Sequence, residues 1–110
     1  MQLPNARNAV VPEAKITQYL LNFQHPKGKD KAEFFTRFGF SLAEWQILRD
    51  ALLTHARVYE VTSTREVYDG TNYSLHGALS TPDGRNPLIR TVWIIREGQN
   101  IPSFVTAYPK

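Results

Sequence analysis

The sequence predicts an α+β fold in which three N-terminal helices pack on a roughly four-stranded antiparallel sheet. The spacing of apolar residues supports this fold, because it follows the helical period as far as about residue 55 and a period of two from Arg57 onward. Short turn-forming segments then separate the later strands by connections of hairpin length. Helices followed by strands joined in this way are typical of an antiparallel sheet with its helices on one face.

The first helix is expected over about residues 13–22. Pro12 is tolerated in the first turn of a helix, and the carboxylate of Glu13 suits the positive end of the helix dipole. The apolar residues that then recur at helical spacing are Ile16, Tyr19, Leu20 and Phe23. Pro26 keeps the residue before it out of the helical region, so residues 24–29 are predicted to form a loop.

Two further helices are expected before the sheet. Asp30 is a suitable N-cap for a helix over about residues 31–38, and Gly39 can take the left-handed conformation that ends it. The segment from Ser41 to Glu44 matches a capping box, in which the serine hydroxyl and the glutamate carboxylate satisfy free backbone amides. The third helix is therefore expected to start at this box and to end near residues 54–55.

Four strands are expected after the third helix, over about residues 57–64, 72–80, 88–97 and 103–108. The third of these is apolar on both faces, which indicates a central strand covered by helices. Turn-forming residues from Thr81 to Arg85 precede it. Burial of Trp45, of Trp93 and of the phenylalanines in the second helix is expected to dominate the core.

Length and composition place the chain among soluble globular proteins. Its 110 residues suit a single domain, 1–110, and its 42% hydrophobic and 21% charged residues are far from the composition of disordered chains. The sequence has no cysteine, which excludes disulfides, thiolate nucleophiles and cysteine-based zinc sites and is expected of a protein in the reducing cytoplasm. No secretory signal pattern begins the chain, and no run of about 18 apolar residues could span a membrane.

Charge and histidine spacing limit the classes of ligand. The net charge of +3 favours anionic partners, but the excess is small for a dedicated nucleic-acid binder. His25, His55 and His76 lie too far apart for a local metal-ligand pattern, so no metal ion or other cofactor is expected. His25 lies beside lysines and would stay neutral, as a general base requires, whereas His55 at a helix end and His76 on a strand are more typical of capping or surface residues.

The loop from His25 to Lys31 concentrates positive charge ahead of a helix. Its lysines are Lys27, Lys29 and Lys31. Ammonium groups and the free amides of a helix N-terminus can together bind a phosphate. The alternative is a solvated loop whose lysines serve solubility alone. The spacing does not match a Walker P-loop, so binding of a nucleoside triphosphate is not expected.

Polar residues interrupt the two most apolar strands. Arg90 and Thr91 lie in the first of these strands, and Thr106 and Tyr108 lie in the last strand of the chain. If the two strands are neighbours, Arg90 and the hydroxyl groups could converge on one patch of the sheet and stabilise charge on a phosphate. In the alternative, Arg90 covers the sheet with its aliphatic stem and pairs with a carboxylate such as that of Glu60.

The segment from Tyr68 to Tyr73 mixes aromatic residues with turn formers. It could stack a nucleic-acid base, or it could form a wide hairpin loop. The residue types alone leave both interpretations open.

A set of motifs extends over nearly the whole chain. The motifs are Tyr19-Leu20-Leu21-Asn22, His25-Pro26-Lys27-Gly28-Lys29-Asp30-Lys31-Ala32, Phe35, Gly39-Phe40, Thr81-Pro82-Asp83-Gly84-Arg85, Ile89-Arg90-Thr91-Val92-Trp93 and Phe104-Val105-Thr106-Ala107-Tyr108-Pro109. Together they resemble a bacterial family catalogued as a domain of unknown function, number 6883. The His-Pro-Lys-Gly segment and the closing Val-Thr-Ala-Tyr-Pro strand are also similar to C-terminal toxin modules of polymorphic secretion systems. Some of those modules resemble metal-independent ribonucleases of the superfamily that groups barnase, EndoU, colicin-type and RelE-like nucleases, which implies N-terminal helices ahead of a four-stranded antiparallel sheet.

The charge placement and this resemblance predict a small RNA-cleaving domain of toxin type. In this hypothesis His25 is the base that activates the ribose 2′-hydroxyl. The residues expected to stabilise charge on the phosphate are Lys27, Lys31 and Arg90, and those expected to orient the scissile group are Thr106 and Tyr108. The partners would be RNA and a cognate small protein of immunity or antitoxin type. The alternative is a non-catalytic interaction module that is itself the partner of another small protein.

Overall fold

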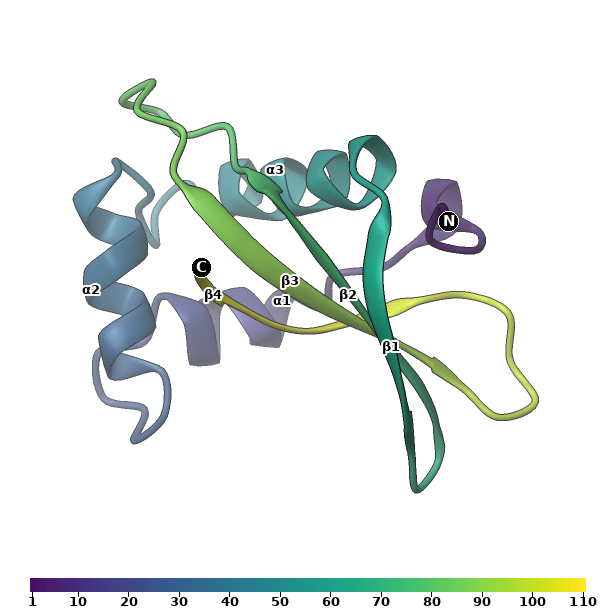
Figure 1. The fold of residues 1–110 in the computed structure, drawn as a ribbon. Helices are drawn as coiled ribbons and strands as arrows, with labels where there is room; N and C mark the ends of the chain where they lie inside the picture. The colour runs from purple at the N-terminus through teal and green to yellow at the C-terminus, as the bar shows by residue number, and fades with distance from the viewer.

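The computed structural model describes residues 1–110 and confirms the α+β class (Figure 1). Its helical elements are η1 (Ala6–Asn8), α1 (Glu13–Lys15), η2 (Ile16–Leu20), α2 (Lys29–Arg37) and α3 (Trp45–Val58). Its strands are β1 (Val61–Val67), β2 (Gly70–Ala78), β3 (Leu88–Arg96) and β4 (Ser103–Pro109). The first predicted helix is present as α1 and the π-helical turn η2, which continues it. None of the helices has the length and apolar character needed to cross a membrane.

The strands form one antiparallel sheet in the order β1-β2-β3-β4, so each strand pairs with the next one along the chain. β3 is a central strand, as its apolar faces predicted. On the face that packs against the helices, Ile89, Thr91 and Trp93 are fully buried. Figure 1 shows α3 running across the sheet and α2 standing beside the end of β4 where the chain terminates. The opposite face of the sheet carries the even-numbered residues of β3, among them Arg90.

A cluster of 17 buried apolar residues joins the helices to the sheet. Trp93 is fully buried, and its ring lies 5.3 Å from that of Phe104 in a T-shaped arrangement. Phe35 is also fully buried, as expected. The expected core residues that are only partly buried are Phe34, Phe38 and Trp45. The contribution of the second helix to the core is therefore smaller than predicted, because α2 lies at the end of the sheet and turns only one side toward it.

The predicted start of α2 is wrong by two residues. Gly28, not Asp30, occupies the N-cap, and Asp30 lies in the first turn, where its carboxylate still suits the positive end of the helix. The helix begins early because the carbonyl oxygen of His25 accepts the amides of Gly28 and Lys29, at 3.1 and 3.0 Å. Gly39 has a φ of 102° after the helix, which confirms its predicted left-handed conformation.

Both predicted ends of α3 need correction. The Ser41 hydroxyl does accept a hydrogen bond from the Glu44 amide, at 3.3 Å, but these residues form a turn and the helix begins only at Trp45. At its other end α3 continues past residues 54–55 to Val58, because the buried residues His55 and Ala56 extend its apolar stripe by another turn. β1 consequently starts at Val61, and the strand predicted over residues 57–64 is wrong in its first four positions.

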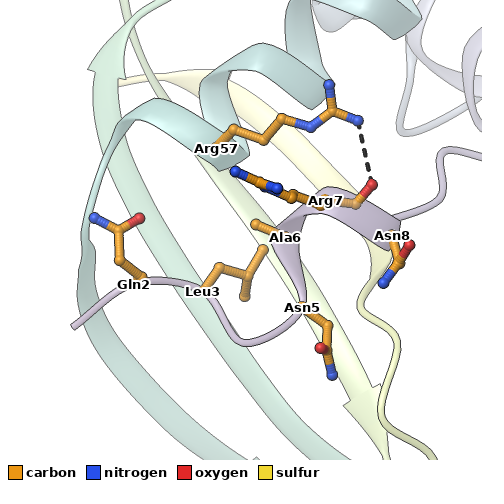
Figure 2. Close-up of a pocket in the computed structure, with 7 residues that line it drawn as sticks. All are labelled: Gln2, Leu3, Asn5, Ala6, Arg7, Asn8 and Arg57. Atoms are coloured by element: carbon orange, nitrogen blue, oxygen red, sulfur yellow. Dashed lines mark hydrogen bonds between the residues drawn. The ribbon is translucent and has the colours of Figure 1, made fainter.

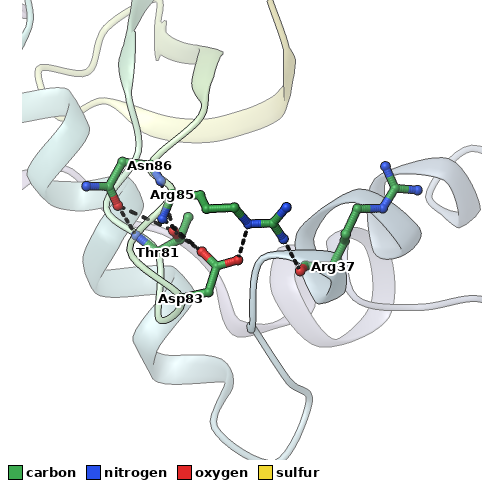
Figure 3. A network of polar contacts seen from close by, with 5 residues as sticks. All are labelled: Arg37, Thr81, Asp83, Arg85 and Asn86. Carbon is green, nitrogen blue, oxygen red and sulfur yellow. Dashed lines mark hydrogen bonds and ion pairs between the residues drawn. The ribbon is translucent and has the colours of Figure 1, made fainter.

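The predicted turn from Thr81 to Arg85 is confirmed, and it holds the C-terminal end of α2 (Figure 3). The Arg85 guanidinium donates to the carbonyl oxygen of Arg37 at 2.8 Å. The Asp83 amide donates to the carbonyl oxygen of Phe38 at 3.2 Å. Hydrogen bonds from Arg85, first the one from its backbone amide, lower the pKa of the Asp83 carboxyl group. This turn fixes α2, whose other end carries the loop from His25 to Lys31.

His55 belongs to the core and not to the surface as predicted, since only 2% of it is exposed. Its Nδ1 lies 3.1 Å from the Thr91 hydroxyl, which accepts a 2.9 Å hydrogen bond from the indole N–H of Trp93. Its Nε2 lies 3.2 Å from the carbonyl oxygen of Gly77. A neutral ring with its proton on Nε2 satisfies both contacts, because Nδ1 then accepts from Thr91 while Nε2 donates to Gly77.

We expect acid to destabilise the protein through His55. Burial is the main cause that lowers the pKa of His55 below its ordinary value of about 6.5. As the pH falls through that ordinary value, the unfolded chain binds a proton that the folded chain resists, so the free energy of unfolding decreases. The decrease continues until the pH reaches the lower pKa of the folded state. Thermal unfolding followed by circular dichroism should give a lower Tm at about pH 5 than at about pH 7.5.

The variant His55→Gln provides the control for this pH effect. Its amide nitrogen can still donate to Gly77, but the side chain does not titrate. The decrease in Tm between the two pH values should therefore be smaller in the variant. An equal decrease in both proteins would assign the effect to other groups, such as His76, whose pKa is also lowered.

Candidate functional site

Five of the six predicted site residues line one groove of about 670 Å³. The groove lies between the α1–η2 segment, the loop that leads into α2, and β4. The residues that line it are Ala14, Lys15, Gln18, Tyr19, His25, Lys27, Lys31, Val105, Thr106 and Tyr108. We call this cavity the basic groove, because it holds three lysines and no carboxylate.

The loop of the basic groove packs directly on the backbone of η2. A Cβ atom on Gly28 would collide with the carbonyl oxygen of Tyr19, so this close approach requires glycine. The ring of Tyr19 also contacts that of His25, with 5.0 Å between the ring centroids. Gly28 is buried as a result, while Lys27 remains exposed toward the groove. The loop is thus held against the helix by packing, and its charges face solvent.

His25 is fixed by two hydrogen bonds to its own loop. Its Nδ1 accepts the backbone amides of Lys27 and Gly28, each at 3.0 Å. An Nδ1 that accepts two N–H groups carries no proton, so the neutral ring has its proton on Nε2. In this conformation His25 can offer the groove a hydrogen-bond donor.

Two lysines of the basic groove lie over the ring of Tyr19. The ammonium groups of Lys15 and Lys31 each lie 5.6 Å from its centroid, within the range of cation–π attraction. Lys15 also donates to the carbonyl oxygen of Val105 at 3.1 Å. No lysine of the groove forms an ion pair. The groove is therefore a concentration of positive charge that no protein carboxylate neutralises, and an anion would be attracted to it.

β4 closes the groove on the side of the sheet. The register of β3 and β4 shifts between Val92 and Trp93, which leaves Val105 as an extra residue in β4. Beside this irregularity, the Thr106 hydroxyl lies 2.9 Å from the hydroxyl of Tyr19. Two residues further along, Tyr108 also lines the groove. Thr106 and Tyr108, the two hydroxyl-bearing residues predicted in this strand, therefore share the groove with the loop from His25 to Lys31.

Arg90, the sixth predicted residue, lies next to the basic groove without lining it. It pairs with Tyr108 across β3 and β4, and its guanidinium carbon lies 5.9 Å from the Tyr108 ring centroid. Its guanidinium donates to the hydroxyl groups of Ser74, at 3.2 Å, and Ser63, at 3.5 Å. The alternative pairing with Glu60 is not formed. Arg90 instead extends the positive charge from the groove onto the open face of the sheet.

Comparison with known proteins identifies the family. The family model described as "Domain of unknown function (DUF6883)" matches residues 2–110. The chain belongs to the DUF6883 family. This membership confirms the resemblance found in the motifs around His25, Arg90 and Tyr108. No curated protein matches the sequence significantly.

The fold of this DUF6883 chain has a relative among solved structures. A chain of the "Contact-dependent growth inhibition toxin - immunity protein complex from Klebsiella pneumoniae 342" superimposes with a TM-score of 0.71 and 14% sequence identity. The match covers 96% of each chain. At this level of identity the comparison establishes a common fold.

Five lining residues of the DUF6883 groove were not singled out in the sequence as site residues, and two of them, Tyr19 and Lys15, make specific contacts there. Tyr19 is at helical spacing with core residues and was assigned to the apolar face of the first helix. Lys15 precedes it by four residues, which places both on one side of that helical segment. The spacing of Lys15 and Tyr19 could have indicated that the two residues act together. That they line a cavity is evident only from the structure, in which β4 packs beside them.

The aromatic segment from Tyr68 to Tyr73 lies outside the groove. Tyr68 and Asp69 form a tight connection between β1 and β2, and the side chain of Tyr68 is fully exposed. The predicted wide hairpin loop is therefore wrong in its width, since Val67 already pairs with Gly70.

A second cavity, of about 580 Å³, lies beside η1 and the C-terminal end of α3 (Figure 2). It contains Arg7 and Arg57, and the Arg57 guanidinium donates to the carbonyl oxygen of Arg7 at 3.4 Å. None of the predicted site residues lines it. Arg57 is therefore a cationic residue whose replacement removes one charge without touching the basic groove.

Proposed function

We propose that the protein is an RNA-cleaving domain of toxin type that requires no metal ion. The observation that carries this proposal is the basic groove, which brings His25, Lys27, Lys31, Thr106 and Tyr108 together and contains no carboxylate. Its volume of about 670 Å³ lies within the range of sites for small molecules, so it can accommodate a nucleotide unit.

The proposed reaction is an attack of the ribose 2′-oxygen on the neighbouring phosphorus. A bond forms between these two atoms, the bond from phosphorus to the 5′-oxygen breaks, and the products are a 2′,3′-cyclic phosphate and a free 5′-hydroxyl. The proton of the 2′-hydroxyl passes to solvent water, or to Nδ1 of His25 if the loop releases that atom, and the 5′-oxygen takes a proton from water. Negative charge increases on the phosphate oxygens in the transition state. Lys27 and Lys31 would stabilise that charge in a groove that offers no competing anion.

The hydrogen bonds of His25 constrain its part in this reaction. As a base it would have to accept the 2′-hydroxyl proton at Nδ1, which already accepts the amides of Lys27 and Gly28. We therefore propose that His25 donates from Nε2 to a phosphate oxygen of the RNA while its Nδ1 keeps the two hydrogen bonds of the loop. It acts as a base only if the loop releases Nδ1.

Thr106 and Tyr108 would position the RNA on the side of the sheet. The hydrogen bond from Thr106 to Tyr19 fixes the threonine hydroxyl close to the lysines. Tyr108 presents an aromatic ring on which an unpaired base can stack. These contacts would align the 2′-oxygen, the phosphorus and the leaving oxygen.

The test of the proposal is cleavage of total tRNA by the purified protein in EDTA. We expect fragments that end in a 2′,3′-cyclic phosphate, because the lysines replace a metal ion as the source of positive charge. No group of three or more His, Cys, Asp or Glu side chains gathers in the structure. The variant Lys31→Gln should cleave about a hundredfold more slowly.

Arg57→Gln is the matched control, because it removes one positive charge far from the basic groove. It should cleave at the rate of the unmodified protein. Intact tRNA after incubation with folded protein, or an equal loss of activity in both variants, would contradict the proposal.

The comparison supports a second candidate as well, since the solved relative is one chain of a complex of a toxin with an immunity protein. In this alternative the chain is a non-catalytic module that binds another small protein, and the basic groove receives an acidic surface of that partner. Expression in bacteria separates the two functions. A nuclease should slow growth unless its groove is altered by Lys31→Gln, whereas an interaction module should be harmless in both forms. If the protein is the nuclease, a cognate small protein that covers the groove is the expected partner.

A further inference from the structure

The face of the sheet that the helices leave open carries a second set of cationic residues. His76 of β2 pairs directly with Arg90 of β3, and Arg90 pairs with Tyr108 of β4. Lys110 follows β4, and its ammonium group lies 2.9 Å from Nδ1 of His76. We call His76, Arg90 and Lys110 the open-face cluster. None of the three forms an ion pair with a carboxylate.

Two buried nitrogen atoms of this cluster have no hydrogen-bond partner. They are Nε2 of His76 and Nε of Arg90. The ammonium group of Lys110 can only donate, so Nδ1 of His76 accepts its hydrogen bond and the proton of the neutral ring lies on Nε2. The guanidinium Nε also carries a proton. Both unpaired atoms are therefore donors, and each costs free energy while it is buried without an acceptor.

The two donors belong to residues that pair directly across β2 and β3. Side chains that face each other across an antiparallel pair have Cβ atoms about 4.5–5.5 Å apart. Burial, and then the charges of Lys110 and Arg90, lower the pKa of His76, which agrees with a site that has donors and positive charge but no anion. An oxyanion would accept from both donors and balance the charge, whereas a cation or an apolar group would satisfy neither.

We propose that the open-face cluster binds a phosphate group, and that on an RNA strand this is the phosphate next to the one held in the basic groove. The second part of this proposal rests on the proposed function. Tyr108 connects the two sites, because it lines the basic groove and its ring lies 5.9 Å from the Arg90 guanidinium. A strand that passes over Tyr108 must have an unpaired base there, so the substrate class is single-stranded RNA or an RNA loop.

Phosphate binding is tested first, without any need for catalysis. The ¹⁵N-labelled protein is titrated with inorganic phosphate, and the side-chain signals of His76 and Arg90 are followed by NMR. We expect saturable shifts of both signals. Replacement by Arg90→Gln should weaken this binding about tenfold or more, because it removes a charged donor.

Lys110→Gln is a second variant whose folding is not at risk, since Lys110 is exposed and lies outside β4. It should also weaken phosphate binding at His76, whereas the control Arg57→Gln should leave the binding unchanged. Lys31→Gln, in the basic groove, should leave the shift of His76 unchanged. Absence of a saturable shift in the folded protein would overturn the proposal and assign the unpaired donors to water. Equal affinity in the unmodified protein and Lys110→Gln would overturn it as well.

The position of this phosphate on RNA is tested with two short substrates. A dinucleoside monophosphate has only the scissile phosphate, while a trinucleoside diphosphate can fill both sites. We expect kcat/KM to be about tenfold higher for the longer substrate, and Lys110→Gln should abolish that advantage. Equal rates on the two substrates would overturn the assignment of the cluster to the neighbouring phosphate. Cleavage of neither substrate would count against the proposed function, and the phosphate titration would still decide whether the cluster binds the anion.

Discussion

Replacement of His25 by alanine is expected to lower the rate of the proposed RNA cleavage by about a hundredfold to about ten-thousandfold. The substitution removes the Nε2 donor from the basic groove and also the acceptor of the Lys27 and Gly28 amides. Single-turnover cleavage of tRNA in EDTA would measure the loss. Circular dichroism of the same sample would establish that the variant is folded.

The variant His25→Asn separates the chemical contribution of His25 from its structural one. The side-chain oxygen of asparagine occupies nearly the place of Nδ1 and can accept the same two amides, as it does in common turns. The loop should therefore keep its shape while the Nε2 donor is lost. We expect cleavage by this variant to be as slow as that by His25→Ala. Full activity of His25→Asn would mean that the imidazole only shapes the loop.

Replacement of Trp93 by alanine is expected to destabilise the fold by about 3–5 kcal/mol. Trp93 is fully buried, packs edge to face on Phe104 and donates from its indole to Thr91. The variant leaves a cavity at the centre of the sheet and removes a donor from the buried contact between Thr91 and His55. Because small domains are stable by only about 5–15 kcal/mol, much of the total would be lost. Urea unfolding followed by circular dichroism would measure the change.

Trp93→Phe is the control for this substitution. It keeps an aromatic ring near Phe104 but cannot donate to Thr91, so it should be destabilised less than Trp93→Ala. If the free energy of unfolding of Trp93→Ala lay within about 1 kcal/mol of that of the unmodified protein, the assignment of Trp93 as the centre of the core would be wrong.

The sequence was a good guide to the type of each element and a weaker guide to its ends. The change from helical to alternating periodicity predicted the α+β order, and the helix stop at Gly39 is confirmed by its φ of 102°. The N-cap at Asp30 and the helix start at Ser41 were wrong, because hydrogen bonds donated to the carbonyl oxygen of His25 and the turn before Trp45 compete with the local capping preferences. Tertiary burial of His55 extended α3 into residues that alternate like a strand.

The sequence predicted five residues of the candidate site but not how they are arranged around the groove. Charge and motif singled out His25, Lys27 and Lys31 at one end of the chain and Thr106 and Tyr108 at the other. Nothing in their spacing indicated that these groups share a groove with Tyr19 and Lys15, or that Arg90 lies just outside it. That information depends on the contact between Tyr19 and Thr106, which are 87 positions apart.

Local patterns were thus enough to establish the order of helices and strands and to mark the loop from His25 to Lys31 as positively charged, because periodicity and charge depend on neighbours in the chain. The packing of the folded molecule alone revealed that Nδ1 of His25 accepts two amides of its own loop, that His55 is buried, and that His76 and Arg90, which pair across the sheet, hold unpaired donors. Each of these properties comes from groups far apart in sequence, since strand register and helix packing bring them into contact.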